Sequence, residues 1–155
     1  MSKTRDTKGI LLRPCTLSDI GQVRVIERES FPEDPYSAVV FISFLMSDKE
    51  GFIVASSGGS VVGYVIGTGN GEEGMIQSMA VALGFRRRGV GAMLMESIIE
   101  HLTTKCRRVS LLVDVSNEAA IRTYRKFSFS ETGRVIEGYY PNGNDAMEMA
   151  RVLGN

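Results

Sequence analysis

The amino-acid sequence predicts one mixed α/β domain whose sheet carries helices on both faces. The chain has 155 residues, which lies within the roughly 100–200 residues of a typical domain. No repeat, low-complexity tract or linker divides it, so we expect a single domain over residues 9–155 after a flexible polar tail over residues 1–8. Segments with strand and helix periodicity alternate along the chain, which is typical of a mixed sheet covered on two faces.

The first third of the chain predicts a short strand and two helices. The strand is expected over residues 10–13. Thr16 and Asp19 fit a capping box, and the apolar residues after them fall on one face of a helix. The prolines of the segment FPEDPYS end that helix, and Ser37 can cap a second, strongly apolar helix.

The remainder predicts six more strands and two more helices, recognised by period-2 runs, by turn clusters and by a stripe of apolar residues at helical spacing. In order, we expect a hairpin of residues 51–56 and 61–67, a loop over 69–74, a strand over 75–82, a helix from Gly89, a strand over 109–115, a helix capped by Asn117, and strands around 130–139 and 146–152.

The charge and composition exclude several functions. The 18 basic and 18 acidic residues balance, which argues against nucleic-acid binding through a broadly basic surface and requires any anion site to be local. The longest apolar stretch, residues 38–46, is far shorter than the roughly 20 residues that span a membrane. The N-terminus lacks an apolar signal segment, so we expect a cytoplasmic protein. Cys15 and Cys106 are isolated, which predicts unpaired thiols and no metal site.

A glycine-rich turn is the most informative segment. Three arginines, residues 86–88, precede Gly89 and Gly91 at the expected start of a helix. The missing side chains let a ligand approach the backbone, and the first helical N–H groups favour an anion such as a pyrophosphate. The alternative is a tight turn with a solvated basic edge. Neither GxxxxGK[ST] nor GxGxxG fits, because Leu94 occupies the third glycine position of the latter.

The string RRRGVG, residues 86–91, resembles the [Q/R]-x-x-G-x-[G/A] signature of the GNAT superfamily of acetyl-CoA-dependent acyltransferases. The segment SNEAAIRTYRKFSF, residues 116–129, is similar to the SNxxAIxxYxKxGF stretch of the same superfamily, with Ser128 at the usual glycine. The resemblance runs from about residue 10 to residue 152. It implies the GNAT fold, with a mixed, mostly antiparallel sheet of seven strands flanked by about four helices on both faces, and acetyl-CoA as acyl donor.

The resemblance also implies which residues hold acetyl-CoA. The strand before the loop would bond the pantetheine arm, the loop amides would cradle the pyrophosphate, and Asn117 would bond pantetheine or cap its helix. Tyr124 would point at the thioester sulfur; plain core packing is its alternative role. The implied cofactor-binding residues are Met79, Ala80, Val81, Arg86, Arg87, Arg88, Gly89, Val90, Gly91, Ala92, Asn117 and Tyr124.

Two further segments, ESFPEDPYS at residues 29–37 and GYYPNGNDAMEM at residues 138–149, resemble the protein N-terminal acetyltransferases of the ribosomal-protein alanine and archaeal branch. The resemblance implies a groove for a protein or peptide N-terminus. Acetylation of a small amine or an internal lysine stays open, as do a catalytically weak acetyl-CoA-binding module, a homodimer and an auxiliary subunit. The implied substrate-binding residues are Phe31, Pro32, Glu33, Tyr36, Tyr139 and Tyr140.

The chemistry needs a neutral amine and a stabilised leaving group. An α-amino group has a pKa near 7.7–8.0, so roughly a tenth to a fifth of it is neutral at pH 7 and can attack the thioester directly. Amides near Met79 and Val81 can stabilise the oxyanion. Tyr124, with a phenol pKa of about 10, can donate a proton to the leaving thiolate, whose conjugate acid has a pKa of about 8.5.

The general base is the weakest part of the motif match. Relatives carry Glu or His at the position of Leu112, or a tyrosine at the position of Met75, and neither is present here. Asp114, two residues along the same strand face, and Glu33 are the candidate bases, each acting through a water. The alternative for Asp114 is a solvated strand end, and His101, the only histidine, is expected at a solvated helix end.

Overall fold

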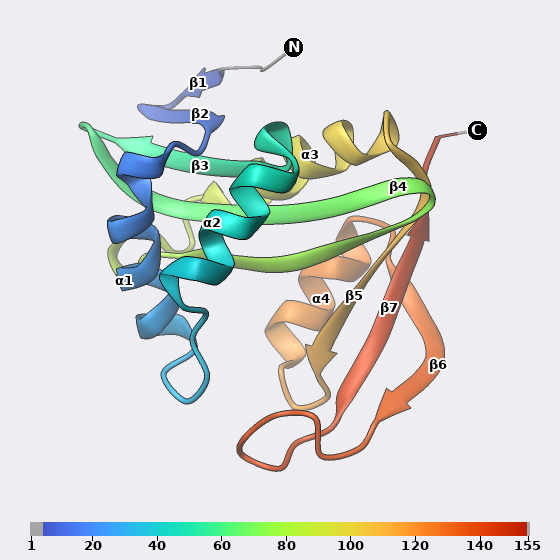
Figure 1. Ribbon diagram of the computed structural model, residues 1–155. Helices are drawn as coiled ribbons and strands as arrows, with labels where there is room; N and C mark the ends of the chain where they lie inside the picture. The colour runs from blue at the N-terminus through green and yellow to red at the C-terminus, as the bar shows by residue number, and fades with distance from the viewer. Residues whose placement is uncertain (1–4, 155) are drawn as a thin grey trace.

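The computed structural model describes residues 5–154, which form a seven-stranded mixed sheet with two α-helices on each face (Figure 1). The strand order is β1-β2-β3-β4-β5-β7-β6, and only the β4–β5 pair is parallel. The predicted fold class is therefore confirmed. The elements are β1 Arg5–Thr7, β2 Ile10–Pro14, α1 Ile20–Ser30, α2 Ala38–Ser47, β3 Phe52–Ser57, β4 Ser60–Val81, α3 Val90–Thr103, β5 Cys106–Asp114, α4 Glu118–Lys126, β6 Ser130–Ile136 and β7 Ala146–Val152.

The strand count matches the prediction, but two strands differ. Residues 5–7, predicted as part of a flexible tail, form β1 and pair antiparallel with β2, so the tail prediction is wrong for them. Residues 1–4 of that predicted tail lie outside the described residues. The predicted strands 61–67 and 75–82, with the loop between them, form the single strand β4, which bends back on itself (Figure 1).

Glycine explains the bend in β4. The amide of Ala82 donates to the carbonyl of Val62 at 2.8 Å, so the two arms of the strand lie side by side. A Cβ at Gly74 would lie 2.6 Å from Cys106 Sγ and 2.9 Å from the Thr68 carbonyl oxygen. Only glycine fits this close approach. The run of glycine and polar residues reads as a loop in sequence although its backbone stays paired.

The predicted helix caps are confirmed. The Thr16 amide donates to the Asp19 carboxylate at 2.8 Å, completing the capping box ahead of α1. Ser37 Oγ accepts from the amide of Val40 at the start of α2. Asn117 Oδ1 likewise accepts from the amide of Ala120 at 3.2 Å at the start of α4.

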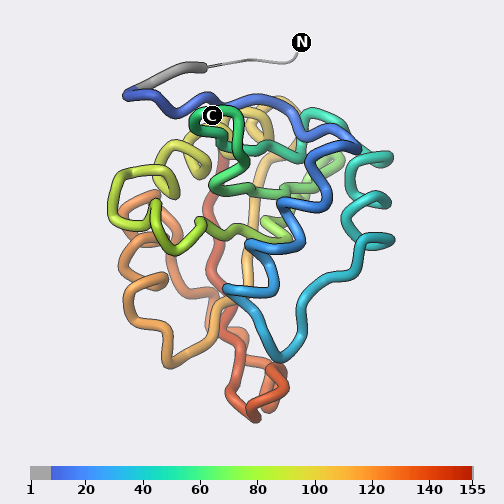
Figure 2. The backbone as a smooth tube through the Cα atoms, turned by 90° about the vertical axis from the view of Figure 1, so that its left-hand side faces the viewer, coloured from blue at the N-terminus to red at the C-terminus, as the bar shows by residue number. Residues whose placement is uncertain are grey.

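Two apolar cores separate the sheet from its helices. Helices α1 and α2 cover one face, over a core that contains Phe41 and Tyr64, and α3 and α4 cover the other, over Leu94 and Met149 (Figure 2). All four side chains are fully buried. In residues 5–154 no helix is long and apolar enough to cross a membrane. The expected cytoplasmic location stays a prediction.

Both cysteines are free and buried, as the sequence predicts. Burial raises the pKa of the Cys15 thiol to about 12, so that this thiol stays protonated at neutral pH.

The parallel pairing of β4 with β5 is short, and the two strands separate where it ends. The register runs from Gly71 opposite Cys106 to Met75 opposite Ser110. Beyond Ser110, β5 continues to Asp114 and is paired there with β7 alone. The second arm of β4 and the end of β5 therefore part, as Figure 1 shows. The parting leaves residues 76–81 of β4 without a partner in β5.

His101 does not lie at a solvated helix end. Its Nε2 lies 2.8 Å from Asp48 Oδ2, and the His101 side chain is 12% exposed. This prediction was wrong because the partner lies 53 residues away in sequence.

We expect Asp48→Asn to destabilise the protein in a pH-dependent way. Burial opposes ionisation of Asp48, but the hydrogen bond and charge of His101, together with Lys105 and a backbone amide, lower its pKa below the usual value. A lowered folded pKa contributes stability above the unfolded value of about 3.9, and this is lost as the pH falls through the folded pKa. Urea unfolding should show a deficit of about 1–2 kcal/mol at pH 6.

At pH 3 the deficit should shrink, because the wild-type carboxylate then begins to protonate. Asparagine retains the oxygen that accepts from the Glu50 amide at 3.2 Å, so the helix-capping contact is preserved. An equal deficit at both pH values would show that the ion pair with His101 contributes nothing.

Candidate active site

The turn between β4 and α3 presents backbone donors to solvent. Gly89, directly before α3, has φ +82°, and Arg87 has φ +64°, both in the left-handed region. The N–H groups of the first turn of α3 have no partner within the helix and carry the positive end of its dipole. This donor set fits a pyrophosphate, as the sequence predicts. A Cβ at Gly91 would meet only Val81 Cγ2 at 3.9 Å, which agrees with a signature that accepts alanine there.

The three arginines of the turn differ in their contacts. Arg86 donates from Nε to the Val81 carbonyl at 2.9 Å and from Nη2 to Ser30 Oγ at 3.2 Å. Its guanidinium therefore braces the turn against β4 and the end of α1, and this arrangement does not support the prediction that it holds the cofactor. Arg87 and Arg88 are exposed, and Arg88 lies 5.1 Å above the ring of Phe85.

The second arm of β4 is irregular where the cofactor arm is expected. Ile76 and Met79 pack into the same core under α3 and α4, although residues three apart in a regular strand face opposite sides. Val81 joins Met79 there, whereas Ala80 packs into the core under α1 and α2. Only the backbone of Ala80 can therefore contact a ligand on the Met79 side. An irregularity of this kind re-aims backbone groups of the strand.

Tyr124 lies on α4 in the same core as Met79 and Val81. Its ring packs edge-on against Phe129, with the centroids 6.2 Å apart. Burial raises the pKa of Tyr124, so the phenol remains protonated at neutral pH. The side chain is a packing group whose hydroxyl keeps its proton. Asn117, at the start of the same helix, acts as the helix cap described above.

Asp114 forms hydrogen bonds with Ser116 and with Asn144, which lies in the connection between β6 and β7. It accepts from the Ser116 amide at 2.9 Å, from Ser116 Oγ at 2.8 Å and from Asn144 Nδ2 at 3.0 Å. Burial opposes ionisation, but these hydrogen bonds outweigh it and lower the pKa of Asp114. Asp114 is therefore a weak proton acceptor, and its evident role is to hold residues 137–145, hereafter the β6–β7 loop.

The two predicted acceptor segments converge. Figures 1 and 2 both place residues 31–37, hereafter the α1–α2 loop, beside the β6–β7 loop at one end of the molecule. Tyr139 and Tyr140 pack edge to face at 5.0 Å. Burial, then Glu27 and Tyr139, raise the pKa of Tyr36.

Burial raises the pKa of Tyr140 to about 12, with contributions from Tyr139, Asp114 and Tyr124. Phe31, Pro32 and Glu33 are exposed on the rim of the α1–α2 loop, at the same end of the molecule.

Sequence reasoning missed two carboxylates. Glu27 is 2% exposed and accepts hydrogen bonds in the interior. The helical spacing could have revealed Glu27 as a buried residue, because it stands four residues after buried Val23 on the apolar face of α1. Glu148 lies directly opposite Leu112 in the β5–β7 register, and accepts from Thr132 and Arg134 at 2.8 and 3.2 Å. Only the strand register could reveal it.

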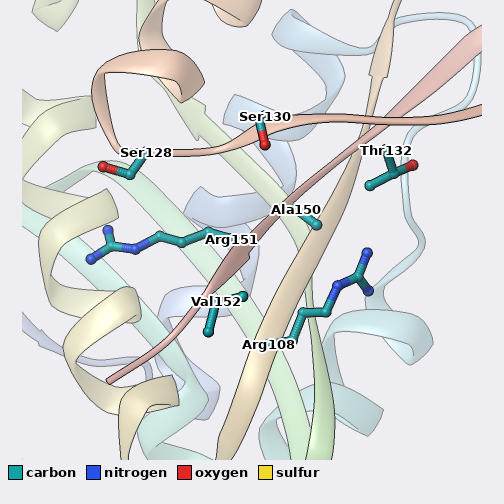
Figure 3. Close-up of a pocket in the computed structure, with 7 residues that line it drawn as sticks. All are labelled: Arg108, Ser128, Ser130, Thr132, Ala150, Arg151 and Val152. Atoms are coloured by element: carbon teal, nitrogen blue, oxygen red, sulfur yellow. The ribbon is translucent and has the colours of Figure 1, made fainter. Parts of the chain in front are cut away.

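Two surface hollows lie apart from the predicted site residues. One of about 310 Å³ is lined by β5, β6 and β7 residues, among them Arg108, Ser130 and Arg151 (Figure 3). The other, of about 500 Å³, is bounded by the bend of β4 and includes Met75 and Ser110. None of the predicted site residues lines either hollow. In residues 5–154 no group of three or more His, Cys, Asp and Glu is placed to hold a metal ion.

The parted strands β4 and β5 lie beside a helix N-terminus whose first amides have no partner within the helix. This arrangement suits a ligand with a long arm, which can run along the strand edge, and a pyrophosphate, which can lie on the amides. An acyltransferase that uses a phosphorylated thioester as its acyl carrier needs such a site. Residues 20–129 match the model of the acetyltransferase (GNAT) family, so the chain belongs to that family and its acyl donor is acetyl-CoA.

Named relatives extend over the whole chain. An N-alpha-acetyltransferase of Sulfolobus acidocaldarius is 36% identical over 99% of this chain and 100% of its own length. The N-alpha-acetyltransferase RimI of Mycobacterium tuberculosis is 27% identical over 98% of both chains. The crystal structure of Ard1 from Thermoplasma volcanium matches with a TM-score of 0.88 and 30% identity, covering 95% of this chain and 99% of that one.

Proposed function

We propose that the protein is an N-alpha-acetyltransferase that moves the acetyl group of acetyl-CoA to the α-amino group of a protein or peptide N-terminus. The observation that carries the proposal is the convergence of the α1–α2 loop, which contains Tyr36, with the β6–β7 loop, which contains Tyr139 and Tyr140, at one end of the molecule (Figures 1 and 2). These two loops, far apart in sequence, are the proposed walls of an acceptor groove. Relatives named N-alpha-acetyltransferase over nearly the whole chain support the same activity.

Each part of the site then has a role. The amides of residues 87–92 hold the pyrophosphate, and the backbone of Met79 and Val81 holds the pantetheine arm and the developing oxyanion. Acetyl-CoA, when bound, supplies an activated thioester. Tyr124 keeps its proton at neutral pH and donates it to the departing sulfur. Tyr139 and Tyr140 align the acceptor backbone with the thioester, so positioning contributes much of the rate.

We expect the amide variants of Glu33 and Asp114 to differ in their kinetic effects. Glu33→Gln should lower kcat several-fold without lowering the melting temperature, because Glu33 is exposed and is our proposed base through a water. Asp114→Asn should raise the peptide KM and leave the pH profile unchanged, because the lowered pKa keeps Asp114 ionised throughout. Steady-state kinetics from pH 6 to 9 measure both. A shifted profile for Asp114→Asn would instead make that residue the base.

A panel of acceptors tests the function itself. Purified protein and acetyl-CoA are incubated with peptides of differing first residue, with the same peptides blocked at the α-amine, and with polyamines, while free thiol is measured. The proposal predicts thiol release with free peptide N-termini only. Release with blocked lysine-containing peptides or with polyamines alone would reassign the acceptor. Tight coenzyme A binding without turnover would identify a binding module.

A further inference from the structure

The carboxylate of Glu27 is a buried charge that the mechanism above does not use. It lies in the last turn of α1 and is 2% exposed. Its Oε2 accepts from the Tyr36 amide at 2.8 Å, and its Oε1 accepts from the hydroxyls of Tyr64 and Ser78. These three donors are neutral groups, and together they satisfy a charge that is costly to bury alone.

The three donors belong to different parts of the site. Tyr36 is in the α1–α2 loop, Tyr64 is fully buried in the first arm of β4, and Ser78 is in the second arm beside Met79. The Tyr64 and Ser78 hydroxyl oxygens are themselves 3.0 Å apart. One carboxylate thus fixes the α1–α2 loop to both arms of the strand that holds the acyl donor.

Tyr36 is held at both ends. Its amide donates to Glu27, and its hydroxyl donates to the carbonyl of Gln77 at 3.3 Å. Its ring packs edge-on against Phe41 with the centroids 5.7 Å apart. The backbone of Tyr36 therefore cannot move away from β4 without breaking its bond to Glu27.

An apolar side chain at position 27 would fit the volume but would leave the Tyr36 amide and the Tyr64 and Ser78 hydroxyls without their acceptor, which lowers stability. What an apolar side chain lacks is the directed acceptor pair that fixes Tyr36 on one side and Ser78 on the other.

We propose that Glu27 is a positioning residue for the acceptor amine. It sets the distance between the α1–α2 loop and the second arm of β4, and with it the geometry in which a polypeptide N-terminus meets the thioester. This inference rests on the proposed function, since the α1–α2 loop is taken to be a wall of the peptide groove.

The test compares Glu27→Leu with Glu27→Gln. Glutamine keeps an oxygen for the Tyr36 amide and can donate to the Tyr64 hydroxyl oxygen, whereas leucine can do neither. We expect Glu27→Leu to lower kcat/KM for peptide about tenfold, chiefly through KM, with the KM for acetyl-CoA within about twofold of wild type. Glu27→Gln should restore activity to within about threefold of wild type.

Asp19→Asn provides the matched control. Asp19 is 5% exposed, lies at the other end of α1 and pairs with Arg13 at 2.6 Å. Its variant should lower the melting temperature and leave the peptide KM unchanged. Should Glu27→Leu not fold, Tyr64→Phe removes one donor and keeps the ring, and it should raise the peptide KM about threefold. An unchanged peptide KM in the folded variant of Glu27 or Tyr64 overturns the inference, as does a glutamine variant no better than leucine.

Failure of the proposed function can be distinguished from failure of the inference about Glu27. If wild type acetylates no peptide, the same variants are compared on the amine that it does acetylate, and an unchanged KM there overturns the role of Glu27. Amide hydrogen exchange over residues 31–37 gives a readout without turnover. It should be faster in Glu27→Leu than in Glu27→Gln, and equal rates overturn the inference.

Discussion

Tyr124→Phe should lower kcat about 100-fold or more while changing the KM for acetyl-CoA by less than about threefold. The phenol of Tyr124 is kept protonated by its burial, and it packs against the same core as Met79 and Val81. Phenylalanine retains the ring that packs on Phe129 and removes only the hydroxyl group, and with it the proton. Because that proton is needed only as the thiolate leaves, the loss falls on the chemical step. Initial rates of thiol release at saturating peptide measure the effect.

Tyr124→Leu controls for packing. It loses both the ring and the proton, so it should lower the melting temperature as well as kcat, whereas Tyr124→Phe should unfold at the wild-type temperature. An unchanged kcat in Tyr124→Phe would remove Tyr124 from the leaving-group role. Equal melting temperatures for the leucine and wild-type proteins would show that the ring contributes no packing energy.

Gly89→Val should weaken acetyl-CoA binding more than tenfold. Gly89 has φ +82°, a conformation that a β-branched residue adopts only with strain. Valine would force the turn out of this geometry and displace the amides at the start of α3, on which the anion site depends. Titration calorimetry with coenzyme A measures the loss. The melting temperature without ligand should fall by only a few degrees, since the turn is exposed.

Gly84→Ala is the matched control in the same segment. A Cβ at Gly84 would meet no atom within 4 Å, and its φ lies outside the left-handed region. The alanine variant should therefore bind coenzyme A like wild type. Wild-type affinity in Gly89→Val would show that the left-handed turn is not needed for binding.

Local features of the fold were predictable from the sequence because they depend on residues three or four positions apart. The capping box of Thr16 and Asp19 and the caps at Ser37 and Asn117 are of this kind. The glycine turn before α3 is another, since the start of a helix creates its own unpaired amides. Motif resemblance added the acyl donor and the acceptor class, which spacing alone could not specify.

Other features were misread because sheet pairing overrides local preference. The polar, glycine-rich run near Gly74 reads as a loop, yet it continues β4, since its glycines allow the close approach of Cys106. Residues 5–7 read as a tail, yet β2 offers them an edge to pair with. Arg86 is a different case: its predicted contact with the cofactor stays a prediction, and its guanidinium meets the Val81 carbonyl and Ser30 in the folded chain.

The sequence by itself determined the fold class, most of the elements and the glycine turn before α3, and it predicts an anion site there and a role for Tyr124. The tertiary structure decided which distant groups meet: Tyr36 with the carboxylate of Glu27 and the carbonyl of Gln77, and Asp114 with Asn144. These contacts depend on strand register and on how loops fold over the sheet, and a shift of one residue would turn each side chain to the other face. Local sequence carries no record of that register, so these contacts could not be predicted from it.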